Sequence, residues 1–319
     1  MCPYRAATDW PLAPEAPHWP RPTGSRSARS LAVSWAPTAP RPMSPTLLAL
    51  LVGAGALGGF IAGLVGVGGG IIFTPVLLFT FRGLGIEDPV LTPLTLGSGL
   101  LCTLAASASG AVAQRAKGAI DYRTALGAGA VAALAVILVT TFVTTQPWYS
   151  KRVFQAVLGT VLVVVVVRMQ TKKDRGGNAL AATGARRGWG ALAATGAAAG
   201  TIASAAGVGG GVVLVPAFNG LVRLPLKLAA GTSTTAIVLI TLTGVLAYLV
   251  RGIGVDVPPG AVGYVHVPYA LALAVPAVLT ARLGVSAAHR IDVRWVRRAF
   301  ALFAAIVAAR LLWNAVGAG

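Results

Sequence analysis

The feature that most constrains this chain is a run of glycines that occurs twice within apolar sequence. The first run spans Gly66 to Gly70 and is followed by Pro75, and the second spans Gly207 to Gly211 and is followed by Pro216. The first glycines of the two runs are 141 residues apart (207 − 66), and so are the two prolines (216 − 75). Glycine interrupts regular helix and permits backbone conformations that other residues avoid. The duplication therefore predicts two related halves, each containing an apolar helix broken by glycines.

Composition decides what surrounds these breaks. Hydrophobic residues make up 56% of the sequence and charged residues 11%, and the mean hydropathy is +0.78. A soluble domain carries about 25% charged residues, so this is a multi-pass membrane protein, expected in the plasma membrane with the lipid bilayer as its partner. The net charge of +18 does not indicate nucleic-acid binding, because the basic residues lie between apolar stretches and no nucleic-acid motif accompanies them.

The apolar stretches form two sets of five, which predicts an all-α polytopic membrane protein with two homologous halves. A crossing requires about 20 residues. The second stretch of each set has only about 14, so we expect eight to ten transmembrane helices. The stretches are 46–66, 68–81, 90–114, 122–145 and 150–168, then 189–206, 208–221, 226–250, 265–283 and 296–316.

These stretches also define the domain organisation. Residues 1–43 are rich in Pro, Arg, Ser and Ala, and are expected to be a disordered tail or an over-extended gene start. The first membrane repeat is 44–168, a cytoplasmic basic linker is 169–188, and the second repeat is 189–319. Because five segments per repeat is an odd number, we expect the repeats to be inverted relative to each other in the membrane.

The glycine runs are the first candidate binding site. A helix that begins after a glycine loop offers free N–H groups and a partial positive charge, which together bind an anion without a charged side chain. Two such helix ends brought together by inverted repeats would form a substrate site in mid-membrane. The alternative is that the glycines only permit close helix packing, the role we assign to the spaced glycines Gly55, Gly59 and Gly63. The candidate substrate-binding glycines are Gly68, Gly69, Gly70, Gly209, Gly210 and Gly211.

Hydroxyl side chains in the third and eighth stretches are the second candidates. Ser98, Thr232 and Ser233 follow the matched glycines Gly97 and Gly231. Their hydroxyls can donate hydrogen bonds to an oxyanion. They can equally bond the carbonyl groups of the preceding helical turn, and the sequence leaves both roles open.

Ionisable residues are informative by their positions. None of the eight acidic residues lies in an apolar stretch. His266, at the start of the ninth, is the one candidate for an intramembrane titrating group, although we expect it at the membrane interface. We find no nucleotide-binding loop and predict no metal or other cofactor. An enzyme requires a nucleophile and a base within reach, so an intramembrane enzyme ranks low, as does an assembly subunit.

The glycine motifs carry a family resemblance. The segment Gly59–Gly70 with Pro75 resembles the opening signature of the TauE/SafE family of sulfite exporters, and the second half repeats it as Gly207–Gly211 with Pro216, followed by Leu228–Ser233. The resemblance extends from about residue 46 to the C-terminus. It implies a membrane permease, a secondary carrier or facilitator, for sulfite, organosulfonates or related small anions.

One departure and one alternative accompany this resemblance. The first half reads Leu96-Gly97-Ser98-Gly99 where the family often has Gly-Thr-Ser, so one hydroxyl is missing there. The alternative function is a permease for another small metabolite or a thiol compound, with the glycine runs serving helix packing only. A homo-oligomer is compatible with either function.

Overall fold

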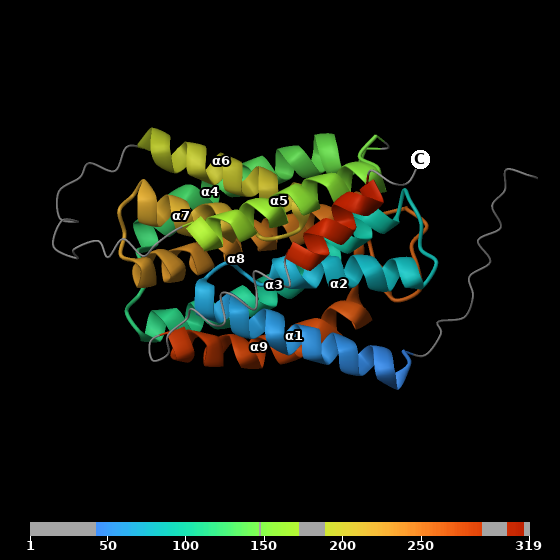
Figure 1. Ribbon diagram of the computed structural model, residues 1–319. Coiled ribbons are helices and arrows are strands. Elements are labelled where there is room, and N and C mark those ends of the chain that lie inside the picture. The colour runs from blue at the N-terminus through green and yellow to red at the C-terminus, as the bar shows by residue number, and fades with distance from the viewer. Residues whose placement is uncertain (1–42, 147, 172–188, 289–304, 316–319) are drawn as a thin grey trace, which may run out of the picture. The chain divides into compact units, whose positions relative to one another are not determined.

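The computed structural model describes residues 43–146, 148–171, 189–288 and 305–315, and the chain is almost entirely helical there (Figure 1). The predicted tail up to residue 42 and residues 172–188 of the predicted linker lie outside the described residues. The first half contains α1 (Pro45–Val65), α2 (Gly70–Gly83), α3 (Leu91–Ala116), α4 (Tyr122–Val139), the π-helix η1 (Thr140–Thr144) and α5 (Lys151–Thr171).

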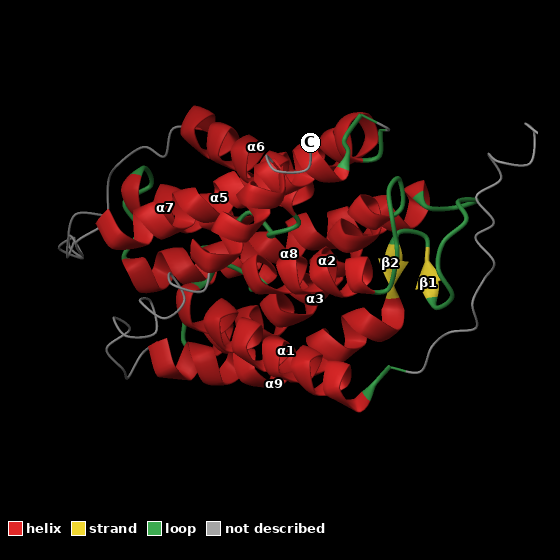
Figure 2. Ribbon diagram, turned by 45° about the vertical axis from the view of Figure 1, so that its right-hand side comes forward, coloured by secondary structure: helices red, strands yellow, loops and turns green. Residues whose placement is uncertain are grey.

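The second half repeats this order. It contains α6 (Trp189–Ala206), α7 (Gly211–Gly220), α8 (Leu226–Arg251), β1 (Ala261–Val262), β2 (Val265–His266), α9 (Val267–Ala288) and a last helical segment, Ala305–Ala315. The two short strands form an antiparallel hairpin that directly precedes α9 in the chain (Figure 2). These helices lie where the apolar stretches predicted them, and both glycine runs separate one helix from the next.

The helix lengths confirm the predicted membrane fold. Five helical segments, α1, α3, α4 with η1, α8 and α9, are each long and apolar enough to cross a bilayer. By contrast, α2 has 14 residues and α7 has 10, fewer than the roughly 20 needed for a crossing. The chain is therefore a multi-pass α-helical membrane protein, while the inverted orientation of its halves stays a prediction.

The two halves interlock through equivalent helices. The first helix of one half, α1, packs against the fourth helix of the other, α9, and α6 packs against α4 in the same way. The third helices α3 and α8 contact each other and lie between these two pairs (Figure 1). Each pair thus contains one helix from each half, so residues far apart in the sequence are brought into contact, such as Gly55 with Leu273 and Gly196 with Ala128.

Spaced glycines allow the backbones of the two helices in each pair to approach closely. A Cβ added to Gly55, Gly59 or Gly63 of α1 would collide with backbone carbonyls of α9. In the same way, Cβ atoms at Gly196 and Gly200 of α6 would collide with carbonyls of α4. The packing role predicted for the α1 glycines is confirmed, and backbone contact of this kind is how small residues stabilise helix pairs in lipid.

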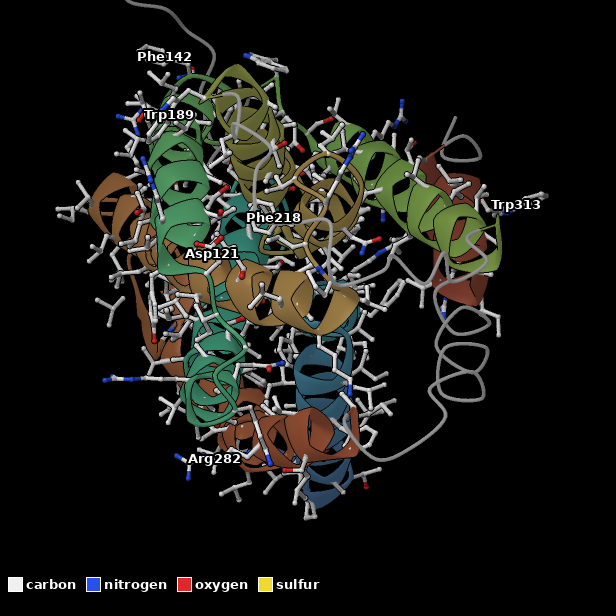
Figure 3. All side chains as sticks on the ribbon, turned by 90° about the vertical axis from the view of Figure 1, so that its left-hand side faces the viewer. Asp121, Phe142, Trp189, Phe218, Arg282 and Trp313 are labelled. Carbon is white, nitrogen blue, oxygen red and sulfur yellow. The ribbon has the colours of Figure 1, made fainter. Side chains whose placement is uncertain are left out.

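Large apolar side chains cover the outside of the described helices. Phe142, Trp189 and Trp313 point away from the helices, whereas Phe218 of α7 lies inside (Figure 3). Phe142 is 66% exposed and Trp313 is 79% exposed, but Phe218 is fully buried. Extensive exposed apolar surface is costly in water and favourable in lipid, as expected of a protein whose solvent is the bilayer.

Candidate functional site

The two glycine runs follow the same backbone path. Gly66, Gly68 and Gly69 have positive φ angles of 75°, 93° and 68°. Their equivalents Gly207, Gly209 and Gly210 have φ angles of 67°, 78° and 76°. Side chains are strained in this left-handed region, so glycine is needed at three of the five positions for conformation alone. The sequence repeat is therefore also a repeat of loop geometry.

The loops meet where the halves join. A Cβ on Gly70 would lie 2.8 Å from the carbonyl oxygen of Gly207 and 2.8 Å from Cα of Val208. A Cβ on Gly211 would lie 2.6 Å from Cα of Val67. The last glycine of each run is thus required because the other loop occupies the space next to it. The predicted meeting of the two runs is present in the structure.

Two equivalent residues of the central helices lie against both loops. Thr103 of α3 and Ile237 of α8 are separated by 134, the same offset that relates Gly97 to Gly231. The Cγ2 methyl of Thr103 would be 3.1 Å from a Cβ on Gly68 and 2.7 Å from one on Gly209, and that of Ile237 would be 3.2 Å from each. Neither residue was singled out from the sequence, although this offset could have found the pair.

Several backbone donors of the loops have no protein partner. Within the residues that the structure describes, the N–H groups of Gly68, Gly69, Gly209 and Gly210 reach no protein acceptor. The N–H of Gly70 does have one, because it donates to the carbonyl of Gly68 at 2.9 Å. Free N–H groups at the beginnings of two helices form an electropositive site suited to an anion.

The predicted hydroxyls of Ser98 and Thr232 connect the halves. The backbone N–H of His266 donates to Oγ of Ser98 at 2.8 Å, and the N–H of Asp121 donates to Oγ1 of Thr232 at 3.0 Å. His266 and Asp121 each directly precede a fourth helix, α9 or α4; Asp121 is labelled in Figure 3. Both hydroxyls are fully buried, and each retains its own proton for a further hydrogen bond.

Ser233 and a residue missed by sequence reasoning, Thr74, bond the loops themselves. Oγ of Ser233 donates to the carbonyl of Gly66 at 3.0 Å, and Oγ1 of Thr74 donates to the carbonyl of Gly207 at 2.8 Å. Both bonds cross from one half to the other. The alternative role, bonding within the same helix, is instead found for neighbouring hydroxyls, such as Thr95 to the carbonyl of Leu91 at 2.7 Å.

The helix that enters the second loop is held by two tyrosines. The hydroxyl of Tyr248 donates to the carbonyl of Ser204 at 3.2 Å, and that of Tyr149 donates to the carbonyl of Ala205 at 2.7 Å. These carbonyls belong to the last turn of α6, and the carbonyl groups of a last turn have no hydrogen-bond donors within the helix. No described side chain bonds the equivalent carbonyls in α1, so the two loop entrances differ.

His266, whose backbone N–H bonds Ser98, has a buried ionisable side chain. Its side chain is 5% exposed, its Nδ1 has no partner among the described residues, and its ring lies 4.7 Å from that of Tyr269 and 5.6 Å from that of Phe81. Loss of solvent lowers the pKa of His266 from its ordinary value of 6.5, which favours the neutral imidazole at pH 7. Within the described residues, no group of three His, Cys, Asp or Glu side chains could hold a metal ion.

Comparisons with known proteins agree on the class of this chain. The family model described as "Sulfite exporter TauE/SafE" matches residues 51–311. A "Probable membrane transporter protein" of Haemophilus influenzae is 27% identical over 263 residues, which cover 82% of this chain and 96% of that protein. A relative of the same description in Methanocaldococcus jannaschii is 23% identical, covering 79% and 90%, and YunE of Bacillus subtilis is 22% identical, covering 84% and 98%. No solved structure matches.

Proposed function

The chain belongs to the sulfite exporter TauE/SafE family, and on that premise we propose that it is a secondary carrier for small sulfur oxyanions such as sulfite or organosulfonates. Membership supports a membrane transporter rather than an enzyme, and the relatives are described as probable membrane transporters. The substrate would be bound at the junction of the two halves. The observation that carries this assignment is the contact between two glycine loops in which the N–H groups of Gly68, Gly69, Gly209 and Gly210 reach no acceptor among the described residues.

The chemistry of the junction suits an anion. The loops offer backbone N–H donors and no carboxylate, since none of the eight acidic residues lies within an apolar helix. A small oxyanion accepts several hydrogen bonds at once, and donors fixed in a low-dielectric site bind it more strongly than they would in water. Relative movement of the interlocked halves would expose this site to each side of the membrane in turn.

The alternative, in which the glycine runs serve helix packing only, is supported at two positions. Gly70 and Gly211 have ordinary φ angles, and each is explained by close approach of the other loop. A permease for a different small metabolite or thiol compound could use them for packing alone. The remaining glycines of the runs differ, because their positive φ angles require glycine for conformation in addition to the close neighbours at their Cβ positions.

Transport by the full-length protein in liposomes tests the proposal. We expect saturable sulfite flux that sulfate, chloride or an organosulfonate inhibits to different degrees. Gly68→Ala keeps the N–H group, but its Cβ is strained at a φ of 93° and would lie 3.1 Å from Cγ2 of Thr103, so the loop and its N–H groups must shift. We expect this shift to reduce the flux about tenfold or more, the effect of one lost charge-assisted hydrogen bond. Gly85→Ala is the matched control, because Gly85 has a similar φ of 80° but lies exposed, with nothing near its Cβ position. Folded protein that carries no small oxyanion would contradict the substrate assignment.

A further inference from the structure

Each glycine loop is held by one hydroxyl from the opposite half. The carbonyl of Gly66 accepts from Ser233 of α8 at 3.0 Å, and the carbonyl of Gly207 accepts from Thr74 of α2 at 2.8 Å. Gly66 and Gly207 are equivalent positions in the two runs, since both are the first glycine. All four residues are buried. The two bonds therefore perform the same task in the two halves.

The donors of these bonds are not equivalent in sequence. Ser233 corresponds to Gly99 of α3 at the offset of 134, and Thr74 corresponds to Val215 of α7 at the offset of 141. A Cβ on Gly99 would lie 2.8 Å from Oγ1 of Thr74. The threonine hydroxyl thus occupies the place that a side chain at residue 99 would take. The first half uses threonine with glycine, and the second half uses valine with serine.

We propose that Thr74 replaces the hydroxyl missing from α3, and that Thr74 and Ser233 are paired positioning residues for the anion site. This inference rests on the proposed function and adds residues that orient the binding groups without contacting the substrate. The departure from the Gly-Thr-Ser pattern at Gly99 is then a relocation of the hydroxyl within the same half. The hydroxyl reaches the same acceptor from α2 that it would otherwise reach from α3.

The physical basis is the planarity of the peptide unit. The carbonyl of Gly66 and the N–H of Val67 belong to one plane and point in opposite directions, so a hydrogen bond that fixes the carbonyl also fixes the N–H. The same holds for Gly207 and Val208. Within the described residues neither valine N–H has a protein acceptor. Each hydroxyl also keeps a carbonyl oxygen, which would repel an anion, turned toward the other half.

The test exchanges the arrangement of one half for that of the other. Thr74→Val should raise the KM for sulfite about tenfold, the effect of one lost hydrogen bond. Gly99→Ser alone should impair transport as well, because the new side chain meets the Thr74 hydroxyl. The double variant Thr74→Val/Gly99→Ser copies the Val215 and Ser233 pair and should return the KM to within about threefold of wild type.

Two further variants separate positioning from simple stabilisation. Thr74→Ser keeps the hydroxyl and should retain the wild-type KM. Thr95→Val removes a buried hydroxyl that bonds its own helix, and it should leave the KM unchanged. A wild-type KM in Thr74→Val, or a double variant no better than Thr74→Val, would overturn the proposal.

Failure of the proposed function has a different signature. If wild-type protein transports no oxyanion, the unfolding temperature in detergent still reports the exchange. A decrease in Thr74→Val that the double variant reverses would then support the cross-half bond while refuting its role in anion transport. The absence of any decrease would refute the bond itself.

Discussion

The backbone N–H of His266 donates to the hydroxyl of Ser98 at 2.8 Å across the junction of the two halves. The N–H of Asp121 makes the equivalent bond to Thr232 at 3.0 Å. Each bond attaches the start of a fourth helix to a third helix from the other half. Residues that the sequence singled out as substrate ligands therefore have a demonstrable role in joining the halves, which makes their loss a question of stability as well as transport.

Ser98→Ala should destabilise the protein. The N–H of His266 would become a buried donor without an acceptor, which costs about 1–3 kcal/mol. Thr232→Val should have a similar effect through Asp121. Thermal unfolding in detergent measures both, and Thr235→Val, whose hydroxyl bonds the carbonyl of Gly231 in its own helix, is the control. An unchanged unfolding temperature in Ser98→Ala together with lost sulfite flux would instead indicate direct contact with the substrate.

Gly70→Ala and Gly211→Ala should each destabilise the loop junction. The added Cβ would lie within 2.8 Å of the opposite loop at Gly70 and 2.6 Å at Gly211, so the backbone must move at a cost of about 1–3 kcal/mol. Gly83→Ala is the control, because nothing lies within 4 Å of its Cβ position. Equal unfolding temperatures for Gly70→Ala and Gly83→Ala would mean that the loops are not in contact.

Acidic pH should destabilise the protein through His266. Burial lowers the pKa of His266 below 6.5, so the unfolded chain binds a proton more readily than the folded protein does. The contribution of His266 to the free energy of unfolding should therefore be constant above about pH 7, and the free energy of unfolding should decrease as the pH falls below 6.5. His266→Gln should weaken this dependence between pH 7.5 and 5. A variant whose unfolding temperature follows pH as steeply as that of wild type would exclude His266 as the cause.

Tyr248→Phe should loosen the end of α6. The carbonyl of Ser204 and the hydroxyl of Thr144 would both lose a buried partner, and we expect a loss of about 1–3 kcal/mol. Tyr122→Phe is the control because Tyr122 is exposed. Hydrogen exchange in the segment 203–210 should increase in Tyr248→Phe only, and exchange that matches wild type would mean that this bond does not hold the loop entrance.

Much of the fold was predictable because hydropathy and glycine placement act locally. A run of apolar residues of sufficient length forms a membrane helix whatever its neighbours are, since its backbone must satisfy its own hydrogen bonds in lipid. The breaks at Gly66–Gly70 and Gly207–Gly211 were predictable for the same reason, because a positive φ angle is a local property that requires glycine at three positions of each run. The two equivalent sets of helices follow directly from the repeated glycine motif, whose offset of 141 relates the start of one half to that of the other.

The candidate site was predictable only in part, because its bonds join residues far apart in the chain. Periodicity and composition alone carry no information on which helix faces which. In the sequence Thr74 is therefore an ordinary threonine of an apolar helix, and only the tertiary structure shows its bond to Gly207, 133 positions away. Packing decided that Ser98 and Thr232 bond backbone N–H groups of the opposite half. The sequence by itself determined the membrane class, the duplication and the broken helices, whereas the tertiary structure decided which hydroxyl holds which loop, since that depends on the distance between atoms of different halves.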